Sequence, residues 1–98
     1  MIQEHLVGDT IFIVTQHDYC EARVYEITKY SIISCEIKKK KIEYQVYNDK
    51  EKEYDIIEQN KKIRKRKEEC QIDINEIFDN EIELLNKRRR KLLNEILN

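Results

Sequence analysis

DNEIELLNKRRRKLLNEIL, residues 79–97, is the stretch that decides how the C-terminal part of the chain folds. Apolar side chains recur along it at the spacing of an α-helical turn, so one side of the predicted helix is apolar. Asp79 or Asn80 can cap its start, and Glu83 lies three positions beyond Asn80, as in a capping box. Asp73 with Glu76 offers a second capping box, which would start the helix one or two turns earlier. The apolar stripe consists of Phe78, Ile82, Leu85, Leu92, Leu93 and Ile96.

One charged residue interrupts this stripe. Arg89 lies near its centre, in the middle of the basic run 87–91. An arginine at such a position must extend its head into solvent, pair with a carboxylate, or face a partner. The sequence therefore predicts an amphipathic helix with one feature that a simple surface helix does not explain.

The chain is short, and its charges are nearly balanced. Its 98 residues predict one domain with a modest core, and its net charge is −1 although 40% of the residues are charged. This balance argues against a generally basic nucleic-acid binder and against an acidic DNA mimic. Most of the positive charges are nevertheless clustered in three runs, which predict local basic patches: residues 38–41, 61–67 and 87–91.

The composition indicates what kind of genome encodes the chain. Isoleucine, lysine and asparagine are abundant, alanine and glycine occur once each, and proline and tryptophan are absent. This bias is typical of a very AT-rich coding sequence, such as that of a low-GC bacterium or of its phages and plasmids. It accounts for part of the lysine excess. With the small size, it suggests a phage- or plasmid-encoded inhibitor or accessory factor.

Targeting signals are not evident. The N-terminus, MIQEHLVGD, lacks the basic start and apolar core of a signal peptide. The longest apolar run, residues 11–14, is far shorter than the ~20 residues that cross a membrane. The odd number of cysteines predicts reduced thiols. We therefore expect a cytoplasmic protein without a membrane partner.

The first part of the chain predicts antiparallel strands. Gly8-Asp9 marks a turn, and residues 10–15 (TIFIVT) follow as a buried strand. Residues 16–18 predict a polar turn. In residues 19–29 the apolar side chains change face, which predicts a bulge or bend near Tyr25-Glu26.

The middle of the chain predicts a hairpin and a charged connector. Residues 33–38 and 42–47 alternate as two half-buried strands, joined by a lysine-rich loop that lacks the residues of a tight turn. A short strand near residues 54–57 and an exposed basic segment follow. Strands first and helix last is an α+β order, with a four- to five-stranded antiparallel sheet or small barrel. The single domain divides into a strand-rich part (8–58), a charged connector (59–72) and a C-terminal amphipathic helix (73–98).

Two segments resemble a known family. GDTIFIV (8–14), EARVYEI (21–27) and the hairpin after them resemble the opening of an SH3-like small barrel. EIFDNEIELL (76–85) is similar to the short helical tail that follows such barrels in small bacterial and phage proteins. The resemblance implies a small barrel with a C-terminal helix. Ala22 stands where many such barrels have glycine, and the proline and tryptophan of a signalling SH3 groove are absent, so binding of proline-rich peptides is not expected.

The sequence predicts neither a catalytic site nor a metal site. His17 and Cys20 have the spacing of two zinc ligands, but Cys35 and Cys70 lack a neighbouring ligand, and a structural zinc needs four. Cys20 and Cys35 are instead expected to face the core. His5 lies in a terminus that we expect to be loose, away from any cleft in which a cysteine nucleophile would work. We therefore expect no enzyme and no cofactor.

The final helix gives the main functional hypothesis, which is protein–protein contact. A helix of about 19 residues is about 28 Å long, whereas a barrel of roughly 60 residues is only about 20 Å across. The last two turns are expected to overhang beyond Arg89, and a two-fold helix pair, which makes a homodimer, would cover them. Alternatively, residues 48–69 fold back over them. The predicted partner-binding residues are Arg89, Leu92, Leu93, Ile96 and Leu97.

Nucleic-acid binding is the alternative hypothesis. Basic loops of a small barrel can follow phosphates, and the six tyrosines offer stacking surfaces. The acidic residues beside every run and the net charge favour a solvated surface instead. The residues that this hypothesis would use are Lys38, Lys39, Lys40, Lys41, Lys61, Lys62, Arg64, Lys65, Arg66, Lys67, Arg88 and Arg90.

Overall fold

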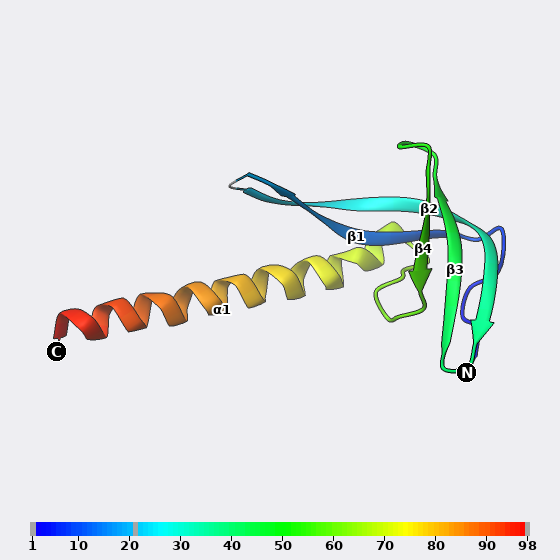
Figure 1. Ribbon diagram of the computed structural model, residues 1–98. Coiled ribbons are helices and arrows are strands. Elements are labelled where there is room, and N and C mark those ends of the chain that lie inside the picture. The colour runs from blue at the N-terminus through cyan, green and yellow to red at the C-terminus, as the bar shows by residue number, and fades with distance from the viewer. Residues whose placement is uncertain (1, 21, 98) are drawn as a thin grey trace.

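The computed structural model describes residues 2–20 and 22–97, and it has the predicted α+β order (Figure 1). Four strands pair antiparallel in chain order, and a long helix follows them. The elements are β1 (Thr10–Tyr19), β2 (Ala22–Lys38), β3 (Lys41–Asn48), β4 (Glu53–Glu58), a short 3-10 helix η1 (Lys67–Glu69) and α1 (Cys70–Leu97).

The sheet is open, with β1 and β4 as its edges in the described part of the chain. A small closed barrel is therefore not confirmed. Part of the β1 edge is covered by the connector, because Phe12 and Arg64 exchange two backbone hydrogen bonds of 2.8 and 2.9 Å. These bonds hold the connector against β1 and bring Ile63 into the core.

The strand that bends the sheet is β2. Its first half pairs with β1 and its second half with β3, and Ser31 is opposite both Thr10 and Tyr47. The register shifts between Ile32 and Ser34, as it does where a bulge adds an unpaired residue. The β1–β2 hairpin therefore runs in the same direction as α1, whereas β3 and β4 stand across it (Figure 1).

The bend predicted near Tyr25-Glu26 is wrong in position, because the pairing with β1 is continuous there. The apolar residues of β2 change face for another reason. The two faces of the strand are covered by different elements. Tyr25 and Ile27 line a groove with α1, whereas Tyr30 and Ile32 enter the core.

Two predicted connections are also wrong. Residues 16–18 continue β1 instead of turning, so the hairpin is longer than expected; Glu21 lies outside the described residues. Only Lys39 and Lys40 join β2 to β3, in place of a longer loop. The tight turn needs no glycine, because neither Lys39 nor Lys40 has a positive φ, and Glu43 forms ion pairs with the lysines on both sides of it.

The core is small and lies where the sheet bends. Ile33 and Ile37, predicted to share the buried face of Cys35, are exposed. Ile33 lies at the register shift, whereas Ile37 is exposed although its cross-strand partner, Ile42, belongs to the core. The alternation predicted for residues 42–47 is confirmed. The buried core consists of Ile11, Tyr30, Ile32, Ile42, Tyr44, Val46 and Ile63, with Ile13, Cys35 and Ile57 packed against it.

The predicted turn at Gly8-Asp9 is confirmed, and it ties the N-terminal segment to β2. Gly8 has a φ of +95°, which favours glycine. Its N–H donates to the carbonyl of Ile32 at 2.8 Å, and the N–H of Ile32 donates to the carbonyl of Asp9 at 2.9 Å.

The helix α1 begins at Cys70, three residues before the earliest predicted start and inside the predicted connector. The Glu69 carboxylate accepts the backbone N–H of Arg66 at 3.1 Å, which caps the turn that leads into α1. Asp79 and Asn80 lie inside the helix and cap nothing. In the described part of the chain, no helix is long and apolar enough to cross a membrane.

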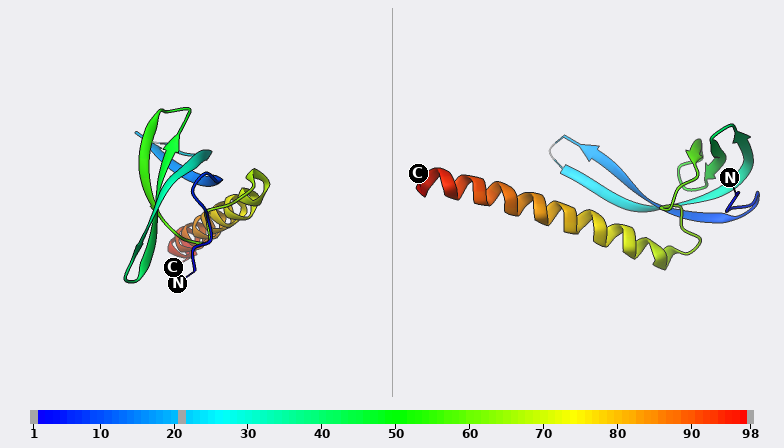
Figure 2. Two further views of the ribbon diagram at one scale, coloured as in Figure 1. Left: turned by 90° about the vertical axis from the view of Figure 1, so that its right-hand side faces the viewer. Right: turned by 90° about the horizontal axis from the view of Figure 1, so that it is seen from below.

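Because α1 extends past the sheet, the molecule is elongated (Figure 2). Its extents are 59 × 31 × 23 Å and its radius of gyration is 18.1 Å, whereas a compact domain of this length has about 13 Å. Its accessible surface is 8159 Å², against about 6,000 Å² for a compact monomer of 12.0 kDa. The chain therefore exposes about 2,000 Å² more than a compact fold of its mass would.

Candidate interaction surface

The distal half of α1, residues 82–97, is exposed at every position. Glu81 is the last residue of α1 whose side chain reaches the sheet. The helix therefore leaves the sheet two turns before Arg89, the residue beyond which the sequence predicts the overhang. Residues 48–69 form β4 and the connector and leave the distal half uncovered. The large apolar side chains exposed on it are Ile82, Leu84, Leu85, Leu92, Leu93, Ile96 and Leu97.

The predicted partner-binding residues all lie in this half, together with Ile82, Leu84 and Leu85, which the sequence analysis does not assign to partner binding. Six residues of α1 are separated alternately by four and three positions. An average spacing of 3.5 is the heptad repeat of helices that pair with another helix. We call these residues the seam: Phe78, Ile82, Leu85, Arg89, Leu92 and Ile96.

The proximal end of α1 is fixed by a buried ion pair. The guanidinium of Arg64 donates two hydrogen bonds, of 2.9 and 2.8 Å, to the carboxylate of Asp73. The Asp73 side chain is 3% exposed and that of Arg64 20%. These hydrogen bonds raise the pKa of Arg64. Arg64, a candidate for phosphate binding in the sequence, is thus used to attach the helix to the connector.

An apolar groove of about 520 Å³ lies between α1 and the β1–β2 hairpin. Tyr25 spans it, because its hydroxyl donates to the Glu81 carboxylate at 2.7 Å and its ring lies edge-on to Phe78, with centroids 5.9 Å apart. The hydrogen bond raises the pKa of Tyr25. Val24 and Phe78 remain 44% and 47% exposed, so the chain does not fill the groove itself. The groove is lined by Val14, Arg23, Val24, Tyr25, Glu26, Ile27, Ile74, Phe78 and Glu81.

The three basic runs lie on different elements and do not meet in one patch. Residues 38–41 form the β2–β3 turn, residues 61–67 lie in the connector, and residues 87–91 lie on the distal half of α1 (Figures 1 and 2). Lys38 and Lys41 form ion pairs with Glu43, at 2.6 and 3.7 Å. This arrangement gives a nucleic-acid backbone no continuous basic track.

The three cysteines and His17 do not come together as a site. Cys20 is exposed near the hairpin tip, where the core does not reach, so its predicted place in the core is wrong. Cys35 is partly buried. Burial raises the pKa of the Cys70 thiol, and a protonated thiol is a poor nucleophile. Among the described residues, no three His, Cys, Asp or Glu side chains are grouped to hold a metal ion.

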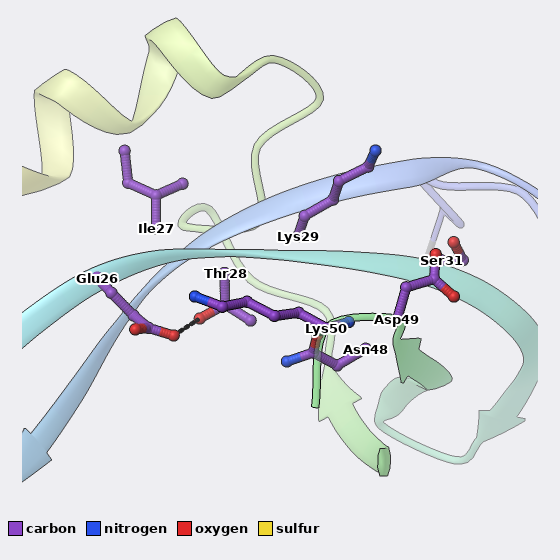
Figure 3. Close-up of a pocket in the computed structure, with 8 residues that line it drawn as sticks. All are labelled: Glu26, Ile27, Thr28, Lys29, Ser31, Asn48, Asp49 and Lys50. Carbon is purple, nitrogen blue, oxygen red and sulfur yellow. Dashed lines mark hydrogen bonds between the residues drawn. The ribbon is translucent and has the colours of Figure 1, made fainter. Parts of the chain in front are cut away.

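A smaller hollow of about 340 Å³ lies between β2 and the β3–β4 turn (Figure 3). Its buried polar side chains are already used within the chain. Thr28 shares hydrogen bonds with Thr15, at 2.6 Å, and with Glu26, at 3.4 Å, and Asn48 accepts the backbone N–H of Lys50 at 3.0 Å. The rim carries charges of both signs. The hollow therefore lacks a free buried group that would orient a ligand.

The chain matches no protein-family model, no curated protein and no solved structure. Its geometry is therefore the basis for any functional proposal.

His5, expected in a loose terminus, is buried against the core. Its ring lies edge-on to Tyr44, with centroids 5.6 Å apart, and its backbone N–H donates to the Tyr44 hydroxyl at 3.2 Å. Tyr44 donates to Gln59, which also accepts the backbone N–H of Glu4 at 2.9 Å. Neither ring nitrogen of His5 has a hydrogen-bond partner within the described residues. Burial, with Lys65 nearby, lowers the pKa of His5.

This histidine predicts a loss of stability in mild acid. The unfolded chain binds the His5 proton near the ordinary pKa of 6.5, whereas the folded chain resists it. His5 should therefore stabilise the fold fully above pH 6.5 and progressively less below it, by at most about 1.4 kcal/mol per pH unit. Urea unfolding near pH 7.5, 6.5 and 5.5 measures this, with His5→Phe as the variant that cannot titrate. Equal pH dependence of the two proteins would contradict the prediction.

Proposed function

We propose that this chain is a non-enzymatic binding protein that engages another protein through the distal half of α1. The observation that supports this most directly is the set of seven large apolar side chains exposed there, beyond the last contact with the sheet. A free helix of about 16 residues is only marginally stable in water. A partner that covers the apolar side would both stabilise the helix and remove its surface from solvent.

The seam indicates the chemistry of that partner. A heptad spacing matches the surface of a second apolar helix better than it matches a flat sheet or an irregular loop. The partner that fits best is therefore a protein that offers an apolar helix of about three heptads. Charged side chains on the opposite side of α1, such as Glu83 and Lys87, stay in solvent.

The placement of the basic runs supports a protein partner over nucleic acid. The runs lie on three elements, and Arg64, Lys38 and Lys41 are engaged by carboxylates within the chain. The exposed apolar area has no role in tracking phosphates, whereas helix pairing uses it directly.

Site-specific photo-crosslinking tests the proposal. A photoreactive residue is placed at Leu92, on the seam, and in a matched variant at Asn94, on the opposite side of the same turn. In cells that express the chain, we expect a protein adduct of defined mass from position 92 and little from position 94. Equal yields from both positions, or adducts with nucleic acid, would contradict the proposal.

A further inference from the structure

We infer that the helical partner is a second copy of this chain, paired antiparallel so that Ile82 of each copy faces Leu85 of the other. This inference rests on the proposed function and specifies its partner. In this arrangement the C-terminal third of one α1 lies beside the groove between α1 and the hairpin of the other.

The central part of the seam is self-complementary in this arrangement, whereas Leu92 and Ile96 face Asn75 and Gln71 of the second copy. In an antiparallel helix pair, the first apolar position of a heptad on one helix faces the second apolar position of a heptad on the other. Ile82 therefore faces Leu85 of the second copy, and Arg89 faces Phe78. A two-fold axis repeats every contact, which makes the interface closed. The central contacts are Ile82 with Leu85 of the second copy and its symmetric repeat, on either side of the axis.

The arrangement also accounts for the arginine in the apolar stripe. One turn from the central contacts, Arg89 of the second copy faces Phe78. The Phe78 residue is 47% exposed in the single chain, and a guanidinium is attracted to an aromatic ring. In a parallel, in-register pair, Arg89 would instead face its own copy, and the two like charges would repel.

Charges beside the seam select this register. Glu81, Arg88 and Glu95 each precede a seam residue on the side of the helix that faces the hairpin. In the inferred register Glu81 of each copy lies next to Arg88 of the other, which gives two ion pairs of opposite charge. A shift of one heptad toward the C-terminus would place Glu81 next to Glu95 and Arg88 next to Arg88. Within the described residues, only Lys87 of the basic run is already ion-paired, with Glu83 at 3.5 Å.

The groove and the exposed area agree with the same arrangement. Leu93 of the second copy faces Ile72, which is 59% exposed. Glu95 of the second copy points to the hairpin side, where Arg23 lines the groove. The excess surface of about 2,000 Å² per chain exceeds the roughly 800 Å² per partner that a stable interface buries.

A charge-swap cycle tests the inference. Sedimentation equilibrium should show a dimer for the natural sequence. Glu81→Arg and Arg88→Glu should each raise the dimer dissociation constant about tenfold, because each single change turns two attractive pairs into repulsive ones. The double variant Glu81→Arg/Arg88→Glu should return to within about threefold of the natural sequence.

Two controls separate the interface from effects within one chain. Tyr25→Phe removes the hydrogen bond to Glu81 without a change of charge and should leave the dissociation constant unchanged. Glu83→Arg/Lys87→Glu swaps the exposed pair on the solvent side, at similar spacing, and should also have no effect.

Several results would overturn the inference. The natural sequence could stay monomeric, or Glu81→Arg could dimerise as tightly as the natural sequence or more tightly. The double variant could also have a dimer dissociation constant no lower than those of the single variants. If the chain is monomeric but position 92 still forms an adduct with a different protein, the inference that the partner is a second copy is wrong, whereas the proposed function stands. Absence of any seam-specific adduct would remove the proposed function as well.

Discussion

Replacement of Arg64 by methionine is expected to lower the free energy of unfolding by about 3 kcal/mol, because it leaves a buried charge without its partner. The Asp73 carboxylate is 3% exposed and receives two hydrogen bonds from Arg64. Without them the buried carboxylate loses both of these hydrogen bonds. Methionine keeps the backbone hydrogen bonds between positions 64 and 12, so the loss reports the side-chain pair.

A double-mutant cycle measured by urea unfolding at one protein concentration checks this expectation. Arg64→Met/Asp73→Leu removes both charges and should recover most of the loss, with a coupling energy of at least about 2 kcal/mol. The exposed pair of Glu83 and Lys87, cycled in the same way, should couple by about 0.5 kcal/mol or less. If Arg64→Met costs no more than breaking that exposed pair, the attachment of α1 depends on other contacts.

The elements predicted correctly are those that local patterns determine. The 3.6-residue period of residues 79–97 and the alternation of Ile42, Tyr44 and Val46 place these residues on helix and strand faces whatever the rest of the chain does. The turn at Gly8 was predictable because glycine adopts the positive φ found there without strain. The α+β order follows from these elements in sequence.

Features that depend on distant contacts could not be predicted. No local pattern distinguishes Arg64 from the other basic residues of the run 61–67, and its role depends on Asp73, nine positions away. His5 looks like a solvent-exposed terminal residue until Tyr44 and Gln59 are placed beside it. The bend was misplaced because the change of face in β2 arises from coverage by two different elements, and not from a bulge near Tyr25.

Part of the candidate surface was also predictable. The exposure of the last two turns follows from helix length alone, and the structure agrees with it. The exposure of Ile82 and Leu85 was missed, because a compact barrel would have covered them, whereas contact with the open sheet ends at Glu81. The alternating spacing of the seam was visible in the sequence, but it suggests pairing only when the sheet is known not to cover those residues.

The double variant Leu93→Asp/Ile96→Asp should be folded, monomeric, and unable to form adducts from position 92. Both side chains are exposed in the single chain, at 46% and 79%, so no intramolecular packing is lost. Two carboxylates in the apolar side of a helix pair would have to be desolvated without partners, which should weaken association by at least a hundredfold, roughly 3 kcal/mol. Sedimentation equilibrium and circular dichroism check the mass and the fold.

Asn80→Asp/Asn94→Asp is the matched control, because it adds the same two negative charges on the solvent side of α1. This control should have the same mass in solution as the natural sequence, which means that it still dimerises. The melting temperature should rise with protein concentration for the natural sequence and the control, because association stabilises the folded state, and should be constant for Leu93→Asp/Ile96→Asp. Unfolding of the latter would mean that both residues belong to the core of a single chain. An unchanged mass would mean that the C-terminal turns carry no interface.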